Sequence, residues 1–280
     1  MEGIADAVQK LVGGAYALLG PLGRPLKDIA HGTTVLRHPL HPALTDAPLG
    51  AWLTGVILDY AARFYHVIPV QAGDIALAFG TLAALGAALT GYTDFHETYG
   101  LERRAALTHG LVMTVVVLLE IVSLIFRWTG GRPAGIAFAT IAVLLAMVGM
   151  YVGGHLTFGF GTMVNRNAFA EGPSDDYVRV GAAGEFPENT MKRVDGGGMP
   201  ALVVRVDGRV CAIAAVCSHA GGPLEEGTLD GRIVTCPWHG SRFDVCTGRV
   251  QGGPATFSQP AFDARERDGQ VELKLPVPLH

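Results

Sequence analysis

The chain has 280 residues, enough for two domains, and a net charge of −4. Hydrophobic residues make up 49 % of the sequence, which excludes a disordered or collagen-like chain, and four cysteines are too few for a disulfide-rich scaffold. The charges are unevenly distributed, because positions 46–165 hold 12 charged residues and positions 166–280 hold 27. This division predicts a membrane-embedded part followed by a water-soluble part.

The first 45 residues precede the apolar region and begin with an amphipathic pattern. Apolar residues recur at helical spacing within residues 3–19, and the acidic start with Glu2 and Asp6 differs from the basic start of a signal peptide. We expect residues 1–45 to form an amphipathic or interfacial segment. A helix that only packs against the rest of the protein is the alternative.

Four apolar stretches follow within residues 46–165, and each is interpreted as a transmembrane helix. They lie near residues 49–64, 75–95, 105–126 and 134–160. A bilayer-spanning helix needs roughly 20 apolar residues, so three stretches fit well. The first is short and carries Asp59 and Arg63, which at a spacing of four residues are expected to pair with each other. A functional role for the Asp59 carboxylate, such as proton handling, is the alternative. The expected fold is a four-helix membrane bundle joined to a C-terminal all-β domain.

The distribution of Lys and Arg in the flanking segments predicts the orientation of this bundle. Seven of these residues lie on the side of the N-terminus and three on the opposite side. Because positive residues are enriched in cytoplasmic loops, both termini are expected in the cytoplasm of a bacterial-type plasma membrane.

Residues 166–176 have the polar composition of a linker, and from residue 177 the pattern changes to short strands. Asp-Gly pairs at positions 207, 230 and 268 separate these strands, which is typical of antiparallel β-hairpins. Residues 166–280 carry a net charge of −3, which argues against a nucleic-acid partner and against docking on anionic lipid. The soluble domain is therefore expected to span residues 177–280.

Two short motifs in this domain combine cysteine with histidine. The first is Cys217-Ser-His219, and sixteen residues later the second is Cys236-Pro-Trp-His239. Two thiolates and two imidazoles can hold zinc, but the first pair is spaced more tightly than usual zinc ligands. The motifs therefore predict a metal site and leave zinc as the alternative to an iron–sulfur cluster.

The motifs resemble the cluster-binding loops of the Rieske family, and the resemblance covers about residues 176–278. It includes the stretches CSHAGGPL and CPWHGSRFD and the later GPA sequence that contains Pro254. In that family each loop gives one cysteine to one iron and one histidine to the other iron of a 2Fe–2S cluster. The resemblance implies a site made of Cys217, His219, Cys236, His239, Ser241 and Pro254.

The loops resemble those of dioxygenase-type Rieske ferredoxins more than those of respiratory cytochrome bc complexes. The extra cysteine that each loop carries in the bc-type proteins is replaced by Gly222 and Trp238. Ser241 keeps a hydroxyl that the bc-type proteins use to hydrogen-bond the cluster, whereas Phe243 replaces their tyrosine. We therefore expect a reduction potential in the lower part of the Rieske range of roughly −150 to +300 mV.

The two remaining cysteines, Cys211 and Cys246, lie outside both motifs in strand-like context. A bridge between them would be unusual in a reducing cytoplasm, so we expect two packed thiols.

Histidines in the apolar part are expected to gather at the cytoplasmic end of the bundle. His66 lies at the other end. A speculative second site consists of His41, His96, His109 and His155. Three interpretations stay open: a b-type haem held best by His109 and His155, a non-haem metal or quinone site, or a hydrogen-bond network without a cofactor. The segment HPLHPALTDAPLGAW also resembles a family of small four-helix bacterial membrane proteins of unknown function.

Together these patterns predict a membrane-anchored one-electron transfer protein, a component of an oxidoreductase rather than a self-contained enzyme. The cluster is expected to exchange electrons with a flavoprotein reductase, an oxygenase or a quinone, and a haem, another metal or a quinone in the bundle is a further expectation. The alternative is a membrane-bound redox sensor, or a ferredoxin tethered near a partner oxygenase by a bundle that serves only as an anchor.

Overall fold

The computed structural model describes residues 2–65, 67–169 and 176–274, and it divides the chain into two compact units. The helical unit comprises Met1–Ala30 and Pro39–Thr162. The β unit comprises His31–His38 and Met163–His280. His66 and most of the expected linker 166–176, namely residues 170–175, lie outside the described residues.

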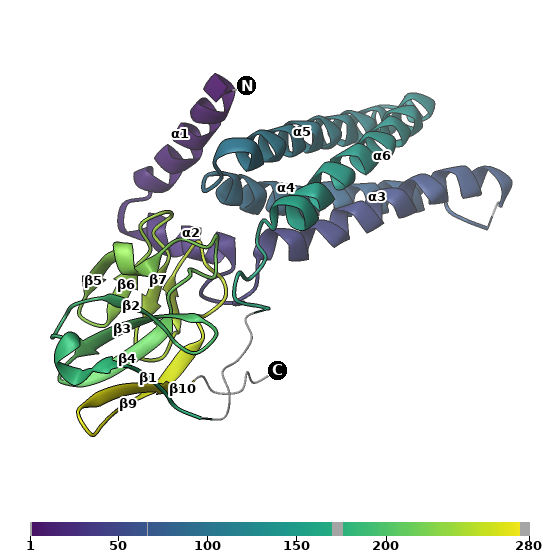
Figure 1. Ribbon diagram of the computed structural model, residues 1–280. Coiled ribbons are helices and arrows are strands. Elements are labelled where there is room, and N and C mark those ends of the chain that lie inside the picture. The colour runs from purple at the N-terminus through teal and green to yellow at the C-terminus, as the bar shows by residue number, and fades with distance from the viewer. Residues whose placement is uncertain (1, 66, 170–175, 275–280) are drawn as a thin grey trace. The chain divides into compact units, whose positions relative to one another are not determined.

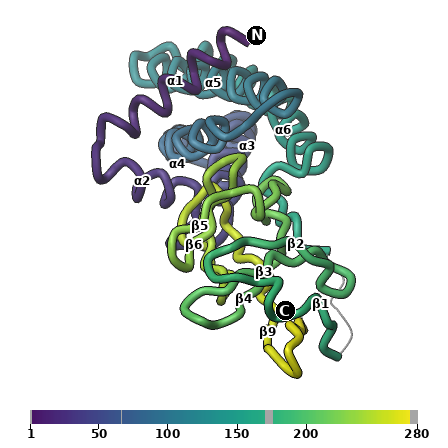
Figure 2. Tube along the Cα trace, turned by 60° about the vertical axis from the view of Figure 1, so that its left-hand side comes forward, coloured from purple at the N-terminus to yellow at the C-terminus, as the bar shows by residue number. Residues whose placement is uncertain are grey.

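The helical unit contains long helices that lie alongside one another (Figures 1 and 2). Among the described residues its helical elements are α1 (Glu2–Leu18), η1 (Gly20–Leu22), α2 (Gly23–His31), α3 (Leu40–Phe64), α4 (Gln71–Phe95), α5 (Gly100–Trp128), α6 (Arg132–His155) and the π-helical turn η2 (Leu156–Phe160). Helices α4 and α5, and α6 together with η2, are long and apolar enough to cross a membrane. Three of the four expected spans therefore meet this criterion of length and hydropathy. Helix α3, which contains the first expected span 49–64, does not.

Helix α3 differs from the predicted first span at its start. It begins at Leu40, after Pro39, and Pro48 lies buried inside the helix. Thr45 also lies inside the helix and donates its hydroxyl hydrogen to the carbonyl of Pro42 at 2.9 Å. The proline removes one backbone hydrogen bond without ending the helix, so α3 is longer than its apolar pattern indicated.

The four long helices pack in a ring in the order α3, α4, α5, α6, with α6 returning to α3. Their core contains Trp52, Leu77, Val116 and Ala139, all essentially inaccessible to solvent. Large apolar side chains cover the outer surface of every one of these helices, a surface suited to lipid rather than to water. Examples are Leu53, Ile57, Phe79, Leu82, Leu118 and Leu144.

A buried ion cluster lies where α3 and α5 end and α4 and α6 begin. Arg127 donates hydrogen bonds to Asp59 Oδ1 at 2.9 Å and Oδ2 at 2.5 Å, and to Asp74 Oδ1 at 2.8 Å. Arg132 also reaches Asp59 and Asp74, at 3.1 and 2.9 Å. The expected pairing of Asp59 with Arg63 is therefore wrong, because helix packing supplies better-placed partners from α5 and α6.

The β unit contains two antiparallel sheets. The six-stranded sheet has the order β1-β10-β9-β4-β3-β2 and the four-stranded sheet has the order β5-β6-β7-β8. The strands are β1 (Val178–Ala182), β2 (Lys192–Asp195), β3 (Pro200–Val206), β4 (Arg209–Ala214), β5 (Thr228–Asp230), β6 (Ile233–Thr235), β7 (Arg242–Asp244), β8 (Val250–Gly252), β9 (Ala261–Arg267) and β10 (Gln270–Lys274), with short 3-10 turns η3 (Ala183–Glu185) and η4 (Leu224–Glu226).

Two of the predicted Asp-Gly hairpin turns have the expected backbone conformation. Asp207 and Gly208 connect β3 to β4 with φ values of 55° and 73°, and Asp268 and Gly269 connect β9 to β10 with 52° and 72°. Two successive residues with positive φ are the signature of a type I′ turn, whose twist matches that of the flanking strands. The all-β prediction for this part of the chain is confirmed.

Cys211 on β4 and Cys246, which follows β7, form a disulfide with their Cα atoms 4.6 Å apart. The expectation of two separate packed thiols is wrong for this structure. Cys211 lies in the six-stranded sheet, whereas Cys246 lies in the turn after β7 of the other sheet. The two are 35 residues apart in sequence, so only the tertiary fold brings them within bonding distance.

Candidate metal centre

The two Cys–His motifs lie in loops of the β unit that have the same backbone hydrogen bonds. In the first, Cys217 accepts a hydrogen bond from Gly221 N–H at 2.9 Å and donates one to the carbonyl of Gly222 at 2.9 Å. In the second, Cys236 accepts from Gly240 N–H at 3.1 Å and donates to the carbonyl of Ser241 at 2.8 Å. Gly221 and Gly240 both have positive φ, which glycine adopts without strain. Each loop therefore holds its cysteine in an equivalent tight turn.

The structure brings the two motifs face to face. The imidazole rings of His219 and His239 are 4.9 Å apart between their centres, and both side chains are partly exposed. Cys217 and Cys236 are buried free thiols at the inner side of the loops. A site with two inner sulfurs and two outer nitrogens follows from this arrangement.

The two thiols are close enough to form a hydrogen bond with each other. Hydrogen bonding to Cys236, together with burial, raises the pKa of the Cys217 thiol. The same hydrogen bond from Cys217 lowers the pKa of Cys236 to about 7. The two sulfur atoms therefore lie next to each other at the inner side of the site.

The residues present fit a binuclear cluster. A Rieske cluster takes two cysteines on one iron and two histidines on the other. The two buried thiols and the two imidazoles at the outer side of the loops match that division of ligands.

A third loop contributes Pro254, which is buried and follows a cis peptide bond, and Ala255. The backbone N–H of Ala255 donates to Ser241 Oγ at 3.0 Å, and Ser241 is fully buried. Since this hydroxyl oxygen accepts from the backbone, its own hydrogen is available to donate to another acceptor. Phe243 is also fully buried, at the position where a tyrosine would add a second hydroxyl.

Replacing Ser241 with alanine is expected to lower the midpoint potential by roughly 60–120 mV, since a hydrogen bond to a charged group contributes about 1.5–3 kcal/mol and a one-electron potential changes by 59 mV per tenfold. The direction follows because a donor to the cluster sulfurs stabilises the more negative, reduced state. Protein-film voltammetry measures the shift. Phe243→Tyr is the matched variant that should raise the potential, and an unchanged value for Ser241→Ala would remove the serine from this role.

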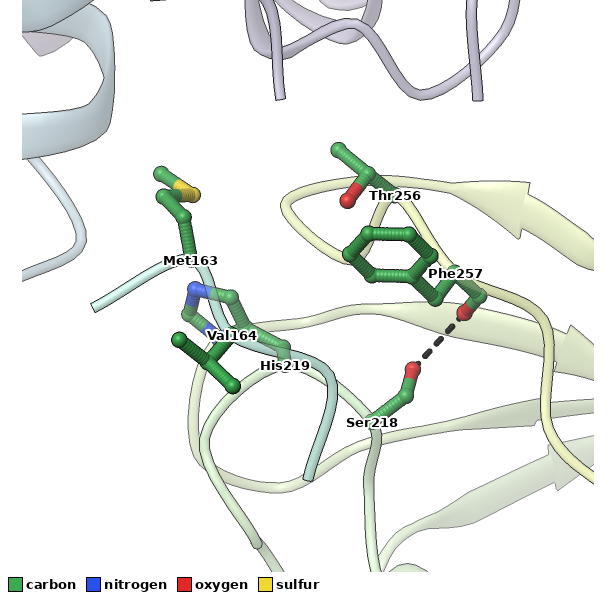
Figure 3. Close-up of a pocket in the computed structure, with 6 residues that line it drawn as sticks. All are labelled: Met163, Val164, Ser218, His219, Thr256 and Phe257. Carbon is green, nitrogen blue, oxygen red and sulfur yellow. Dashed lines mark hydrogen bonds between the residues drawn. The ribbon is translucent and has the colours of Figure 1, made fainter. Parts of the chain in front are cut away.

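A small hollow lies beside His219, lined by Met163, Val164, Ser218, Thr256 and Phe257 (Figure 3). Two of these residues come from the segment that follows η2. The same segment is fastened to the first loop, because Arg166 N–H donates to the Ser218 carbonyl at 3.0 Å and Asn167 Nδ2 donates to the Val216 carbonyl at 3.0 Å. Sequence reasoning missed these residues, because it assigned Met163 and Val164 to the end of the membrane domain and Arg166 and Asn167 to a polar linker.

The histidines of the helical unit do not gather at one point among the described residues. His41 and His109 lie next to each other, with ring centres 6.2 Å apart. His155 is exposed and packs on Phe160 at 5.2 Å, so the pair expected to hold a haem, His109 and His155, is not the pair that the structure brings together.

His96 belongs to a polar cluster at the end of α4. Its ring nitrogen Nδ1 is 3.0 Å from Glu97 Oε1 and 3.2 Å from Lys27 Nζ, and Lys27 also pairs with Glu97. Burial raises the pKa of Glu97, but the hydrogen bond from His96 and the charge of Lys27 outweigh it and lower the pKa to about 2. His96 is therefore part of an ion-pair network with Glu97 and Lys27 in this structure.

Comparison with known proteins decides the family. Residues 176–263 match the Rieske [2Fe-2S] domain model. Ferredoxin CarAc from Metapseudomonas resinovorans is 36 % identical over 96 residues, which cover 34 % of this chain and 90 % of that protein. The chain belongs to the Rieske family. The ferredoxin component of the naphthalene 1,2-dioxygenase system of Pseudomonas aeruginosa is 34 % identical over 102 residues, which cover 36 % of this chain and 98 % of that protein.

The Rieske domain is one of two family matches in the chain. Residues 37–166 match a predicted membrane protein family, DUF2231. Among solved structures, the complex of reduced oxygenase and oxidized ferredoxin in carbazole 1,9a-dioxygenase matches with 32 % identity and a TM-score of 0.35, covering 38 % of this chain and all of the matched one. The two family matches show a Rieske domain preceded by a domain of a predicted membrane protein family.

Proposed function

We propose that this protein is a membrane-anchored one-electron carrier whose Rieske domain holds a 2Fe–2S cluster. The observation that carries the proposal is the pair of equivalent loops, with two buried thiols inside and two imidazoles 4.9 Å apart at the rim. Cys217 and Cys236 would hold the inner iron, and His219 and His239 the outer iron. When bound, such a cluster supplies reversible one-electron transfer.

The chain's own residues support exchange with a protein partner at the histidine rim. Trp238, beside His239, is 54 % exposed, and its ring centre lies 6.3 Å from that imidazole. A rigid exposed aromatic is a common anchor in protein interfaces. Because the ferredoxin relatives are named as components of dioxygenase systems, an oxygenase and a flavoprotein reductase are the proposed partners, with a quinone as the membrane alternative.

We further propose that α3 is a fourth spanning helix, completing the bundle. It has 25 residues, its outer face carries exposed Leu53 and Ile57, and Asp59 on it is satisfied by buried Arg127 rather than by water. The proposed organisation is an interfacial segment 1–45, whose residues 40–45 already form the start of α3, a membrane domain 46–165, a linker 166–176 and a Rieske domain 177–280 on the cytoplasmic side. The sequence patterns alone support three parts of this proposal: the interfacial role of residues 1–45, the linker, of which residues 170–175 lie outside the described residues, and the cytoplasmic orientation.

A tethered ferredoxin, in which the helical unit is only an anchor, is the second candidate. It is favoured by the coverage of the relatives, since the Rieske domain alone matches 90 % of the length of Ferredoxin CarAc. The two candidate functions differ in whether the Rieske cluster exchanges electrons with a haem or quinone in the helical unit. Such exchange requires a cofactor in that unit, whereas a unit that serves only as an anchor needs none.

The cluster proposal is tested by electron paramagnetic resonance and visible spectra of the full chain in detergent, before and after dithionite. The wild-type protein is expected to give a Rieske-type signal and two irons per chain. Cys236→Ser and His239→Ala should lose both, because each removes one ligand. His155→Ala is the matched control, since that histidine is exposed and distant in sequence from the loops. A signal that survives in Cys236→Ser would contradict the ligand assignment.

A further inference from the structure

The four long helices of the helical unit form two hairpins, α3–α4 and α5–α6. Several residues of the first hairpin have counterparts in the second, 68 positions later on the first helix and 62 positions later on the second helix. Asp59 on α3 and Arg127 on α5 form the buried ion pair and are 68 positions apart in the chain. His41 on α3 and His109 on α5, the adjacent imidazoles, are separated by the same 68 positions. The two hairpins are therefore related by a pseudo-two-fold repeat that brings equivalent residues together.

Both histidines are held in the same way by the second helix of their own hairpin. His41 Nδ1 lies 2.8 Å from the carbonyl oxygen of Ala87 on α4. His109 Nδ1 lies 2.9 Å from the carbonyl oxygen of Gly149 on α6. Ala87 and Gly149 are 62 positions apart, so the acceptors are repeat equivalents as well.

A glycine one helical turn after each acceptor makes room for the ring. A Cβ atom at Gly91 would lie 2.7 Å from His41 Cε1, and a Cβ at Gly153 would lie 3.0 Å from His109 Cε1. These glycines are again 62 positions apart. Two histidines, two backbone acceptors and two glycines thus form one site with internal symmetry.

These hydrogen bonds fix the chemistry of the two rings. A backbone carbonyl only accepts, so Nδ1 of each neutral imidazole is the donor and Nε2 carries the lone pair. A ring whose Nδ1–H is anchored on a carbonyl is the usual form of a histidine that binds a metal through Nε2. Both imidazoles therefore have an Nε2 lone pair available to bind a metal.

We propose that His41 and His109 together ligate one transition-metal centre in the helical unit. Two imidazole nitrogens on opposite sides of one metal atom place the ring centres roughly 6 Å apart, given metal–nitrogen bonds of about 2 Å. The observed separation is 6.2 Å. Because α3 and α5 are opposite in the ring of four helices, the two ligands approach from opposite sides of the bundle.

The metal is either the iron of a haem or a free transition-metal ion. In both cases the two imidazoles of His41 and His109 bind it. The described residues offer no third His, Cys, Asp or Glu to this pair. A porphyrin supplies four ligands itself, so haem iron needs only the two side chains, whereas a bare ion would complete its shell with water.

The test is the metal and haem content of the full chain, purified in detergent from cells supplied with iron, copper, zinc and a haem precursor. The pyridine haemochrome assay measures haem, and elemental analysis measures metal beyond the two cluster irons. About one additional equivalent per chain is expected, and it should fall at least about tenfold in His41→Ala and in His109→Ala. His155→Ala should retain it.

The glycine positions offer variants that leave both ligands in place. Gly91→Ala pushes against His41 and is expected to lower the metal content, whereas Gly86→Ala on the same helix has nothing within 4 Å and should leave it unchanged. The Rieske signal, measured separately in every variant, keeps a failure of this inference distinct from a failure of the cluster assignment, and helical circular dichroism reports whether the helical unit has folded. The inference is overturned if the wild-type chain contains no additional metal. It is also overturned if a variant that combines His41→Ala with His109→Ala keeps the additional metal.

Discussion

Replacing Arg127 with alanine is expected to destabilise the helical unit by about 3–5 kcal/mol, the cost of leaving a buried charge without its partner. The guanidinium and the Asp59 carboxylate are both fully buried, and their two hydrogen bonds are side by side. Arg127 also reaches Asp74 and, through Nε, Ser123 Oγ at 3.1 Å. Removing it leaves two carboxylates facing one remaining arginine.

The matched control is Arg132→Ala. Arg132 binds the same two carboxylates, but its side chain is 28 % exposed, so water replaces part of what is lost and a cost of about 1 kcal/mol is expected. Denaturant titration of the purified chain, followed by helical circular dichroism, gives both values. Asp59→Asn combined with Arg127→Gln should cost less than Arg127→Ala, since no charge is stranded. An Arg127→Ala variant as stable as Arg132→Ala would contradict the buried-pair argument.

The candidate site was largely predictable because its signals are local in sequence. The Cys-x-His and Cys-x-x-His spacings lie in two short loops, and the Asp-Gly turns carry their own backbone preference. The geometry adds what spacing cannot, namely that the thiols of Cys217 and Cys236 are hydrogen-bonded to each other and that the rings of His219 and His239 lie edge to face with their centres 4.9 Å apart.

The helical unit was predictable in outline but not in its contacts. Helical periodicity reveals which residues share one helix, so Asp59 was assigned to Arg63 four residues away. The actual partner is 68 residues away on α5, and the same holds for His109, which meets His41 rather than His155. Partners across a bundle depend on how helices pack, and a single sequence does not contain that information.

Breaking the Cys211–Cys246 disulfide is expected to lower the free energy of unfolding of the Rieske domain by about 3–4 kcal/mol. The bond closes a loop with a sequence separation of 35, and the chain entropy it removes from the unfolded state has this size. It also links β4 of one sheet to the turn after β7 of the other. The Cys211→Ala/Cys246→Ala variant should therefore unfold at lower urea concentration, while its cluster signal is retained because neither residue is a proposed ligand.

The same bond tests the proposed orientation, because a cytoplasmic location and a disulfide oppose each other. Cytoplasmic reductants keep thiols reduced, so the proposed orientation requires Cys211 and Cys246 to be mainly thiols in cells and to oxidise after purification in air. Acid-quenched cells labelled with a maleimide, before and after reduction, measure the fraction. The expected result is labelling of both cysteines without prior reduction, with the Cys211→Ala/Cys246→Ala variant as the blank. Complete protection until a reductant is added would instead place the Rieske domain in an oxidising compartment, and the seven-to-three distribution of Lys and Arg would then have predicted the wrong side.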